Sequence, residues 1–293
     1  MEYVFQLIVD SVLLGGLYTL MVMGLSLSFG ITRVINFAHG EAIMLGAYGA
    51  YWAMTLTNID PLIAMPFLMV LGAIAGFLIF RALFSRVLSA PAVNQILLTF
   101  GLGLVLQNLA LALWTGDQRS TNPVYVFASL DLGDGTVVAV GRLIGFGVAV
   151  ALVSALFLWL KYTETGRASR ALAENGEAAI LMGIDIQRTY ATAFGVSTAL
   201  GVATGCILSS LAAVTPFMGF GILVKSFAII VLGGLGNVIG SVIGAFLLAF
   251  AETIVSYYVP NGNGWAEAVA FAVLFFVLIL RPSGIAGQAV TTD

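Results

Sequence analysis

Long apolar stretches, separated by short polar segments, follow one another along the whole chain. A bilayer core about 30 Å thick needs about 20 apolar residues in a helix. Runs of that size lie at 4–29, 40–56, 62–80, 92–114, 142–160, 189–212, 240–258 and 265–280. A shorter run at 222–234 is broken by glycines. The pattern predicts an all-α polytopic membrane protein with about eight to nine transmembrane helices.

The composition supports that fold class and excludes several others. Of the 293 residues, 60% are hydrophobic and only 9% are charged, whereas about 25% are charged in a soluble domain. This excludes an ordinary cytosolic enzyme, a nucleic-acid binder and a disordered tail. The single cysteine, Cys206, lies in an apolar run, and the single histidine has no metal-ligand partner at a recognisable spacing. We therefore expect no disulfide framework, metal site or catalytic group.

The basic residues indicate an orientation, because Lys and Arg accumulate on the cytoplasmic side. With the N-terminus outside and the short run counted as a crossing, the C-terminus is inside. The inner segments then hold Arg33, Arg81, Arg86, Lys161, Arg167, Arg170, Arg188 and Arg281, and the outer ones hold Arg119 and Arg142. If the short run only re-entered the membrane, Arg281 would lie outside. The long outer connection, 115–141, has the alternation of a small hairpin.

The long inner connection, 161–188, contains the signals of a short capped helix. Asn175 is a good N-cap, Glu177 follows in the first turn, and Gly183 stands where a left-handed residue ends a helix. These signals predict a helix over 176–182. Either it docks into another protein or it is a solvated connector on the membrane surface.

A polar segment separates the first two apolar runs. It contains Asn36, Phe37, His39 and Glu41, and Arg33 precedes them at a spacing that allows a pair with Glu41. Backbone outside a helix is tolerated at membrane depth only where protein buries it or water reaches it. The segment is therefore an interfacial turn held by hydrogen bonds or a movable inner gate.

Polar side chains also follow one face of the fourth run. Gln95, Thr99, Gly103 and Gln107 fall within an arc of about 120° on a helix. Such a stripe is unfavourable against lipid, so it should face the protein interior. There it lines a translocation path or forms hydrogen bonds with neighbouring helices.

Glycines mark a third region of interest. Gly236, Gly240 and Gly244 repeat every four residues, which favours close helix packing. The preceding pair, Gly233 and Gly234, ends the short run and offers a hinge.

Two ionisable residues, Lys225 and Glu252, lie within apolar runs at similar depth. A charge at the centre of a membrane helix costs about 2.5–3.5 kcal/mol on insertion scales, so each needs a partner. We predict a structural ion pair; a contact with substrate is the alternative.

Several of these motifs resemble those of a known family. The run Glu177-Ala178-Ala179-x-x-x-Gly183 is similar to the loop by which permeases of ATP-binding-cassette (ABC) importers engage their ATPases. The preceding stretch around Arg167 and Arg170, the phrase 36–41 and the terminal 281–284 resemble branched-chain amino acid permeases of the LivH-like family. The resemblance covers essentially the whole chain, and so implies one permease domain, 1–293, with a periplasmic loop at 115–141 and a cytoplasmic coupling loop at 161–188.

The resemblance implies a transport subunit of the bacterial inner membrane. No Gly-Lys pair exists to cradle a nucleotide phosphate, so partner ATPases would bind ATP and Mg²⁺. The implied partners are a second permease subunit, two ATPase subunits and a periplasmic solute-binding protein. Branched-chain amino acids are the implied cargo; urea, short amides and aromatic or carboxylic acids are alternatives. An ATPase-independent secondary carrier and a membrane enzyme are the competing classes.

Overall fold

The computed structural model describes residues 2–88, 90–133, 135–281 and 284–286; Pro282 and Ser283 of the C-terminal motif lie outside them. The helices in this part of the chain are α1 (Glu2–Thr32), α2 (His39–Thr57), α3 (Pro61–Ile79), a π-helical turn (Phe80–Phe84), α4 (Ser85–Val87), α5 (Ala92–Trp114), α6 (Val140–Tyr162), α7 (Glu164–Glu174), α8 (Gly176–Leu181), α9 (Ile186–Leu211), α10 (Met218–Gly233), α11 (Val238–Tyr258) and α12 (Ala266–Leu280). Short 3₁₀ turns lie at Val124–Val126 and Gly262–Trp265, and two strands are β1 (Ser129–Asp131) and β2 (Val137–Ala139).

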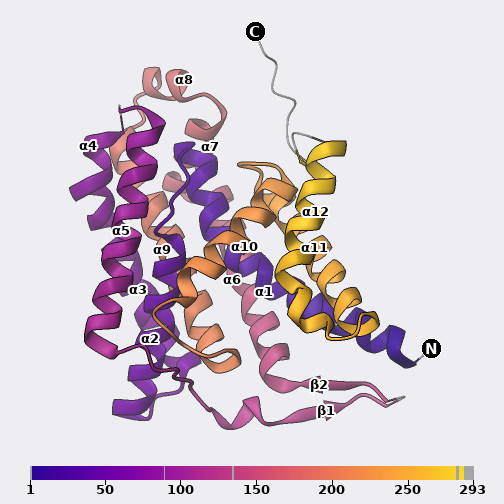
Figure 1. Ribbon diagram of the computed structural model, residues 1–293. Helices are drawn as coiled ribbons and strands as arrows, with labels where there is room; N and C mark the ends of the chain where they lie inside the picture. The colour runs from indigo at the N-terminus through magenta and orange to yellow at the C-terminus, as the bar shows by residue number, and fades with distance from the viewer. Residues whose placement is uncertain (1, 89, 134, 282–283, 287–293) are drawn as a thin grey trace.

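Helices α1 and α9 form the centre of the bundle. In Figure 1, α1 runs obliquely through the molecule, from beside α11 to the end that carries α7. The most apolar parts of α1 and α9 are 78% and 83% buried, against 22%, 17% and 17% for the spans that contain α3, α5 and α6. The peripheral helices therefore present apolar side chains outward, as expected for surfaces that face lipid or a partner subunit.

Every predicted apolar run became a helix. Six of the described helical spans are long and apolar enough to cross a membrane, and α10 and the apolar part of α12 are shorter. The chain is therefore a polytopic, essentially all-α membrane protein, whereas its number of crossings and its orientation stay predictions. The first helix extends slightly beyond the predicted run 4–29. Helix α1 continues to Thr32 and ends where Arg33 adopts a left-handed φ of +58°.

Polar connections lie at opposite ends of the bundle. Helices α7 and α8 cover one end, and the β1–β2 hairpin lies at the other (Figure 1). The hairpin is antiparallel, with Ser129 opposite Ala139, so the strand alternation in 115–141 predicted it correctly. Helices α1 and α6 begin beside the hairpin: Gln6 of α1 donates to the Val137 carbonyl of β2 at 3.0 Å, and α6 follows β2 directly.

Candidate functional site

The connection between α1 and α2, residues 33–38, is held by its own hydrogen bonds. The Ala38 backbone N–H donates to Asn36 Oδ1 at 3.0 Å, and the His39 backbone N–H donates to the Asn36 carbonyl at 3.1 Å. Asn36 is buried, and the ring of Phe37 packs edge-on against that of Phe100 on α5, with centroids 6.5 Å apart. The α1–α2 connection is therefore irregular backbone that the protein itself satisfies and covers.

His39 and Glu41 lie inside the bundle, in the first turn of α2. A Cβ built at Gly24 of α1 or Gly201 of α9 would come within 2.5 Å or 3.2 Å of the His39 ring, so the ring fills the space between these two helices. The Glu41 carboxylate lies against Gly219 of α10, and its Oε2 has no hydrogen-bond partner among the described residues. A buried carboxylate of this kind is costly.

The expected pair between Arg33 and Glu41 is wrong. Arg33 is exposed, and its Nη2 donates to the carbonyl of Ala173, the penultimate residue of α7, at 3.1 Å. Arg33 points to the surface because it ends α1, whereas the first turn of α2 carries Glu41 into the bundle. The α1–α2 connection is thus tied directly to the polar end of the molecule.

Two positions of the α5 stripe face the α1–α2 connection and the start of α2. Thr99 is fully buried, and its Oγ1 lies 3.5 Å from a backbone carbonyl of the connection. A Cβ built at Gly103 would lie 3.7 Å from the Glu41 side chain. Gln95 instead donates to two carbonyls of the turn before α5, at 2.9 and 3.2 Å, and Gln107 is half-buried. The stripe therefore packs beside Glu41 at Gly103 and forms hydrogen bonds with the α1–α2 connection and with the turn before α5.

Lys225 and Glu252 form the ion pair that the sequence predicts. Lys225 Nζ on α10 lies 3.1 Å from Glu252 Oε1 on α11. A third residue, Tyr18 of α1, donates its hydroxyl to Glu252 Oε2 at 2.5 Å and accepts from Lys225 Nζ at 2.9 Å. Sequence reasoning missed Tyr18, because a tyrosine in an apolar run carries no spacing that points to distant charges. The three groups hold α1, α10 and α11 together.

The glycine repeat brings α10 and α11 into close contact. A Cβ at Gly233 would overlap the carbonyl oxygen of Gly240, and a Cβ at Gly240 would overlap that of Gly233. Gly244 packs against α10 one turn further on. Between the helices, Gly234 and Gly236 adopt φ of +105° and +80°, which side chains with a Cβ rarely adopt. The turn thus needs its glycines; its role as a hinge stays a prediction.

Helix α8 is short and fixed at both ends. Asn175 Oδ1 accepts from the Ala178 backbone N–H at 3.0 Å, as an N-cap does. Gly183 has the left-handed φ of +83° that the sequence predicts. The helix ends at Leu181, one residue earlier than expected, because Met182 already leaves helical geometry.

The side chains of α8 divide into one buried anchor and several exposed groups. Ala179 is 4% exposed, whereas Glu177 and Ala178 lie at the surface. Leu181 and Met182 are 88% and 83% exposed. Large apolar side chains so open to water at a polar end of the molecule are typical of a surface that another protein covers.

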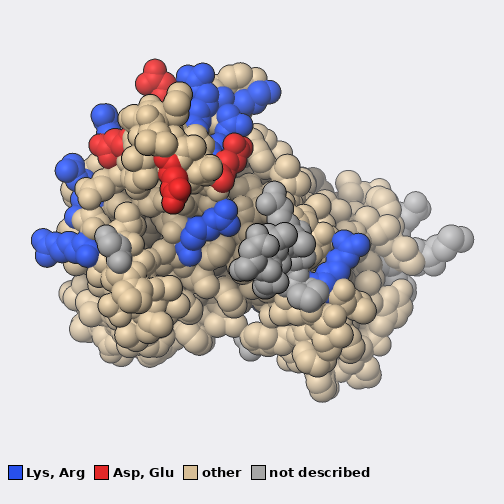
Figure 2. Space-filling model, turned by 90° about the horizontal axis from the view of Figure 1, so that it is seen from above, with Lys and Arg blue, Asp and Glu red and all other residues tan. Residues whose placement is uncertain are grey.

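Basic side chains gather at the end that carries α7 and α8. Figure 2, which views this end, shows them interspersed with a few acidic ones. The exposed basic residues in the segments that meet here are Arg33, Arg81, Arg86, Lys161, Arg167, Arg170, Arg188 and Arg281. Arg119 and Arg142 belong to segments at the hairpin end. The fold therefore places the basic residues of the predicted inner segments at one end of the molecule and those of the predicted outer segments at the other.

Comparison with known proteins identifies the family. Residues 7–278 match the family described as "Branched-chain amino acid transport system / permease component". The chain belongs to this family. The high-affinity branched-chain amino acid permease LivH of Escherichia coli is 30% identical over 98% of this chain and 96% of its own, and LivH of Salmonella typhimurium is 29% identical with the same coverage. The corresponding BraD protein of Pseudomonas aeruginosa is 30% identical over 97% of this chain and 95% of its own. No solved structure matches significantly.

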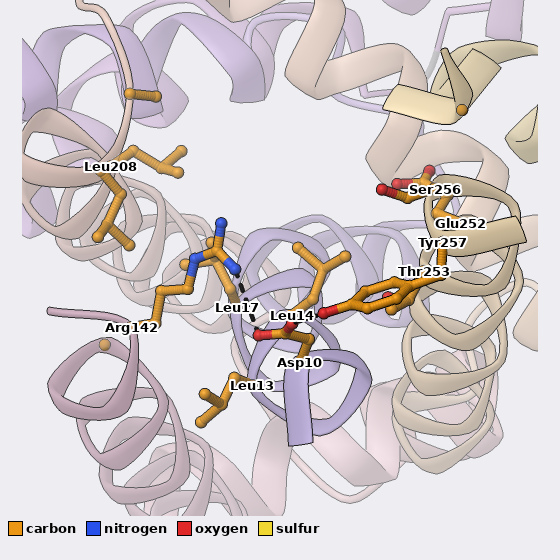
Figure 3. A pocket seen from close by; sticks show the side chains of 14 residues that line it. Asp10, Leu13, Leu14, Leu17, Arg142, Leu208, Glu252, Thr253, Ser256 and Tyr257 are labelled. Atoms are coloured by element: carbon orange, nitrogen blue, oxygen red, sulfur yellow. Dashed lines mark hydrogen bonds and ion pairs between the residues drawn. The ribbon is translucent and has the colours of Figure 1, made fainter. Parts of the chain in front are cut away.

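This permease has a cavity of about 670 Å³ at the hairpin end, between α1, α6, α9 and α11 (Figure 3). Asp10 of α1 stands at its edge and joins two other helices. It accepts from the Tyr257 hydroxyl at 2.6 Å and lies 3.5 Å from Arg142 Nη1. Sequence reasoning did not connect the two residues, because Asp10 lies inside the first apolar run and Arg142 begins the fifth. Only the tilt of the helices brings them together.

Proposed function

We propose that this permease is the membrane subunit of an ABC importer that carries branched-chain amino acids across the bacterial inner membrane. It works with a second permease subunit, two ATPase subunits that bind ATP and Mg²⁺, and a periplasmic solute-binding protein. The end with α8 faces the cytoplasm and the hairpin end faces the periplasm. Family membership supports the permease role, and the names of the LivH and BraD relatives support this cargo.

The observation that carries the ATPase coupling is the construction of α8. A helix of 6 residues is marginal in isolation, yet Asn175 and Gly183 fix its ends. The segment presents Leu181 and Met182 outward, where the rest of the described chain does not cover them. An ATPase surface with an apolar groove fits this shape, since apolar anchors supply much of the energy of protein interfaces.

The distribution of basic residues supports the orientation. Eight exposed Lys and Arg residues lie in segments at the α8 end and two in segments at the hairpin end, counting those named above. Lys and Arg favour the cytoplasmic side. The same orientation makes α8 accessible to cytoplasmic ATPases.

Contacts behind α8 supply a route from the ATPases to a gate. Arg33 joins the α1–α2 connection to the end of α7. A Cβ at Gly236 would come within 3.4 Å of the α-carbon of Gly30 and 3.6 Å of Arg33 Nη1, so the α10–α11 turn packs at the same point. In this proposal, movement of α8 is transmitted through α7 to the α1–α2 connection and to the α10–α11 turn. In this mechanism His39 and Glu41 move with the start of α2 and open or close the inner end of the path.

A charge placed on α8 tests the coupling. Leu181→Asp combined with Met182→Asp changes only exposed side chains, so the protein should fold and insert normally. We expect loss of ATPase co-purification and of the ATP hydrolysis that a loaded binding protein stimulates. Leu132→Asp, at a residue 59% exposed at the hairpin end, is the matched control and should keep both. Unchanged stimulated hydrolysis in the double variant would refute the coupling role.

The cargo is tested separately on the partner. Mass spectrometry of the ligand that co-purifies with the solute-binding protein should identify leucine, isoleucine or valine. Finding urea, a short amide, or an aromatic or carboxylic acid would contradict the proposed cargo but would not affect the proposed coupling role of α8. Transport by the permease alone in liposomes would instead support a secondary carrier.

A further inference from the structure

The cavity at the hairpin end is formed by transmembrane helices and lined by both charged and apolar groups. We propose that it binds one α-amino acid with an apolar side chain, in its zwitterionic form, on the way through this subunit. The proposal rests on the importer function proposed above and adds to it a substrate site within this chain. Its volume of about 670 Å³ lies in the range of about 300–1,000 Å³ of small-molecule sites.

The charges around the cavity sum to zero and form two ion pairs, Asp10–Arg142 and Lys225–Glu252. Asp10 and Arg142 lie at its edge, Glu252 lies on another wall, and Lys225 stands behind Glu252. Figure 3 shows Arg142 and Glu252 on opposite sides of the open space. A zwitterion matches this arrangement, because each of its two charges can lie beside a side chain of opposite charge. It has no net charge, so the total charge of the site stays zero when it binds. A dicarboxylate or another net anion would leave charge uncompensated.

Arg142 is the group that suits the carboxylate of the ligand. Its side chain is 61% exposed, and its contact with Asp10 is long, at 3.5 Å. A guanidinium has five N–H donors in a fork that fits a carboxylate. Because α6 begins at Val140, Arg142 stands in the first turn of that helix, where the free backbone N–H groups also favour an anion.

Acidic groups suit the ammonium. The Glu252 side chain is 5% exposed and is fixed by Tyr18 and Lys225, so its orientation does not have to be set when a ligand arrives. Asp10 is similarly fixed by Tyr257. Each carboxylate has about four lone-pair positions. Glu252 Oε1 is buried, whereas the Asp10 side chain is 19% exposed, so Asp10 offers the position that a ligand ammonium can reach.

Leucine side chains form the apolar part of the wall. Three come from α1 and two from the end of α9: Leu13, Leu14, Leu17, Leu208 and Leu211. Apolar area that leaves water here contributes roughly 25 cal/mol per Å². A branched aliphatic side chain uses this wall, whereas urea or a short amide would leave it in contact with water. The lining therefore favours an apolar amino acid over the other cargo classes.

A single reactive cysteine in the cavity tests the proposal without using transport as the readout. The native Cys206 is buried, so Cys206→Ala removes it with little change in volume. In that background, Leu14→Cys places a thiol on the half-buried wall, and Leu132→Cys places a matched thiol at the same end but on the hairpin. The assembled transporter in nanodiscs is labelled with a maleimide in the presence of L-leucine, leucinol, succinate or urea.

We expect saturating L-leucine to slow labelling of Leu14→Cys by tenfold or more and to leave Leu132→Cys unaffected. Succinate and urea should protect neither. Adding Arg142→Gln should raise the half-protecting concentration of leucine about tenfold, the loss of one charged contact, without raising that of leucinol, which has no carboxylate. A merely structural role of Arg142 would shift both ligands equally and would overturn its assignment.

Equal protection by succinate or urea, or no protection by leucine, would overturn the site. The two proposals fail separately. If the α8 double variant keeps stimulated ATP hydrolysis while leucine still protects Leu14→Cys, the coupling role fails and the site stands. If α8 behaves as proposed and leucine does not protect, the importer stands and this cavity is not its amino acid site.

Discussion

The carboxylate of Glu41 lies against Gly219: a Cβ built at Gly219 would come within 2.7 Å of both carboxylate oxygens. One residue is in the first turn of α2 and the other in the first turn of α10. The starts of α2 and α10 are therefore in close contact at this point. In the proposed importer this contact is where a gate movement meets the helix that carries Lys225.

Gly219→Ala tests that fit. The added methyl group should displace Glu41 and destabilise the protein by about 1–3 kcal/mol, the usual cost of overpacking, with a marked loss of uptake. Gly221→Ala is the control on the same helix, because a Cβ there meets nothing within 4 Å. Thermal unfolding in detergent and uptake in vesicles measure both. Equal behaviour of the two variants would show that the contact at Gly219 is unimportant.

Because Lys225 and Glu252 form a pair, we expect the effect on stability of a substitution at one to depend strongly on the residue at the other. Lys225→Met should destabilise the protein by about 3–5 kcal/mol, because it leaves a buried carboxylate unpaired. Adding Glu252→Gln should restore most of that stability by removing the charge. The free energy of unfolding of the four proteins in the double-mutant cycle measures the coupling. Additive effects would contradict a direct pair.

Gly183 should be sensitive to substitution in a way that Gly176 is not. At φ +83° a Cβ costs about 1–2 kcal/mol, so Gly183→Arg should distort the end of α8 and uncouple stimulated ATP hydrolysis while the protein still inserts. Gly176→Ala, at the first residue of the same helix and with nothing within 4 Å of its Cβ, should retain coupling. Unchanged stimulated ATP hydrolysis in the Gly183→Arg variant would show that the end of α8 does not couple the permease to the ATPases.

The contact between α10 and α11 should not tolerate a larger residue. Gly240→Val would force α11 away from the Gly233 carbonyl, and we expect poor expression or a large fall in the unfolding midpoint. Gly147→Val on α6, where a Cβ meets nothing within 4 Å, should be close to wild type. A Gly240 variant as stable as the Gly147 variant would mean that the two helices separate without cost.

The sequence alone determined the features that depend on neighbours along the chain. Apolar runs had to become membrane helices, because only internally hydrogen-bonded segments are stable in lipid. Asn175 and Gly183 marked the ends of α8 because capping is local. Lys225 and Glu252 were assigned to each other because the membrane leaves a buried charge few alternatives.

Tertiary structure decided what depends on how distant helices cross. It added Tyr18 to the charged pair, and it gave Arg33 the carbonyl of Ala173 in place of Glu41. It also placed Asp10, Arg142 and Tyr257 around one cavity, although they lie on three helices far apart in sequence. Helix tilt and close packing at small residues set these contacts. No spacing along one segment encodes the angle at which another segment crosses it.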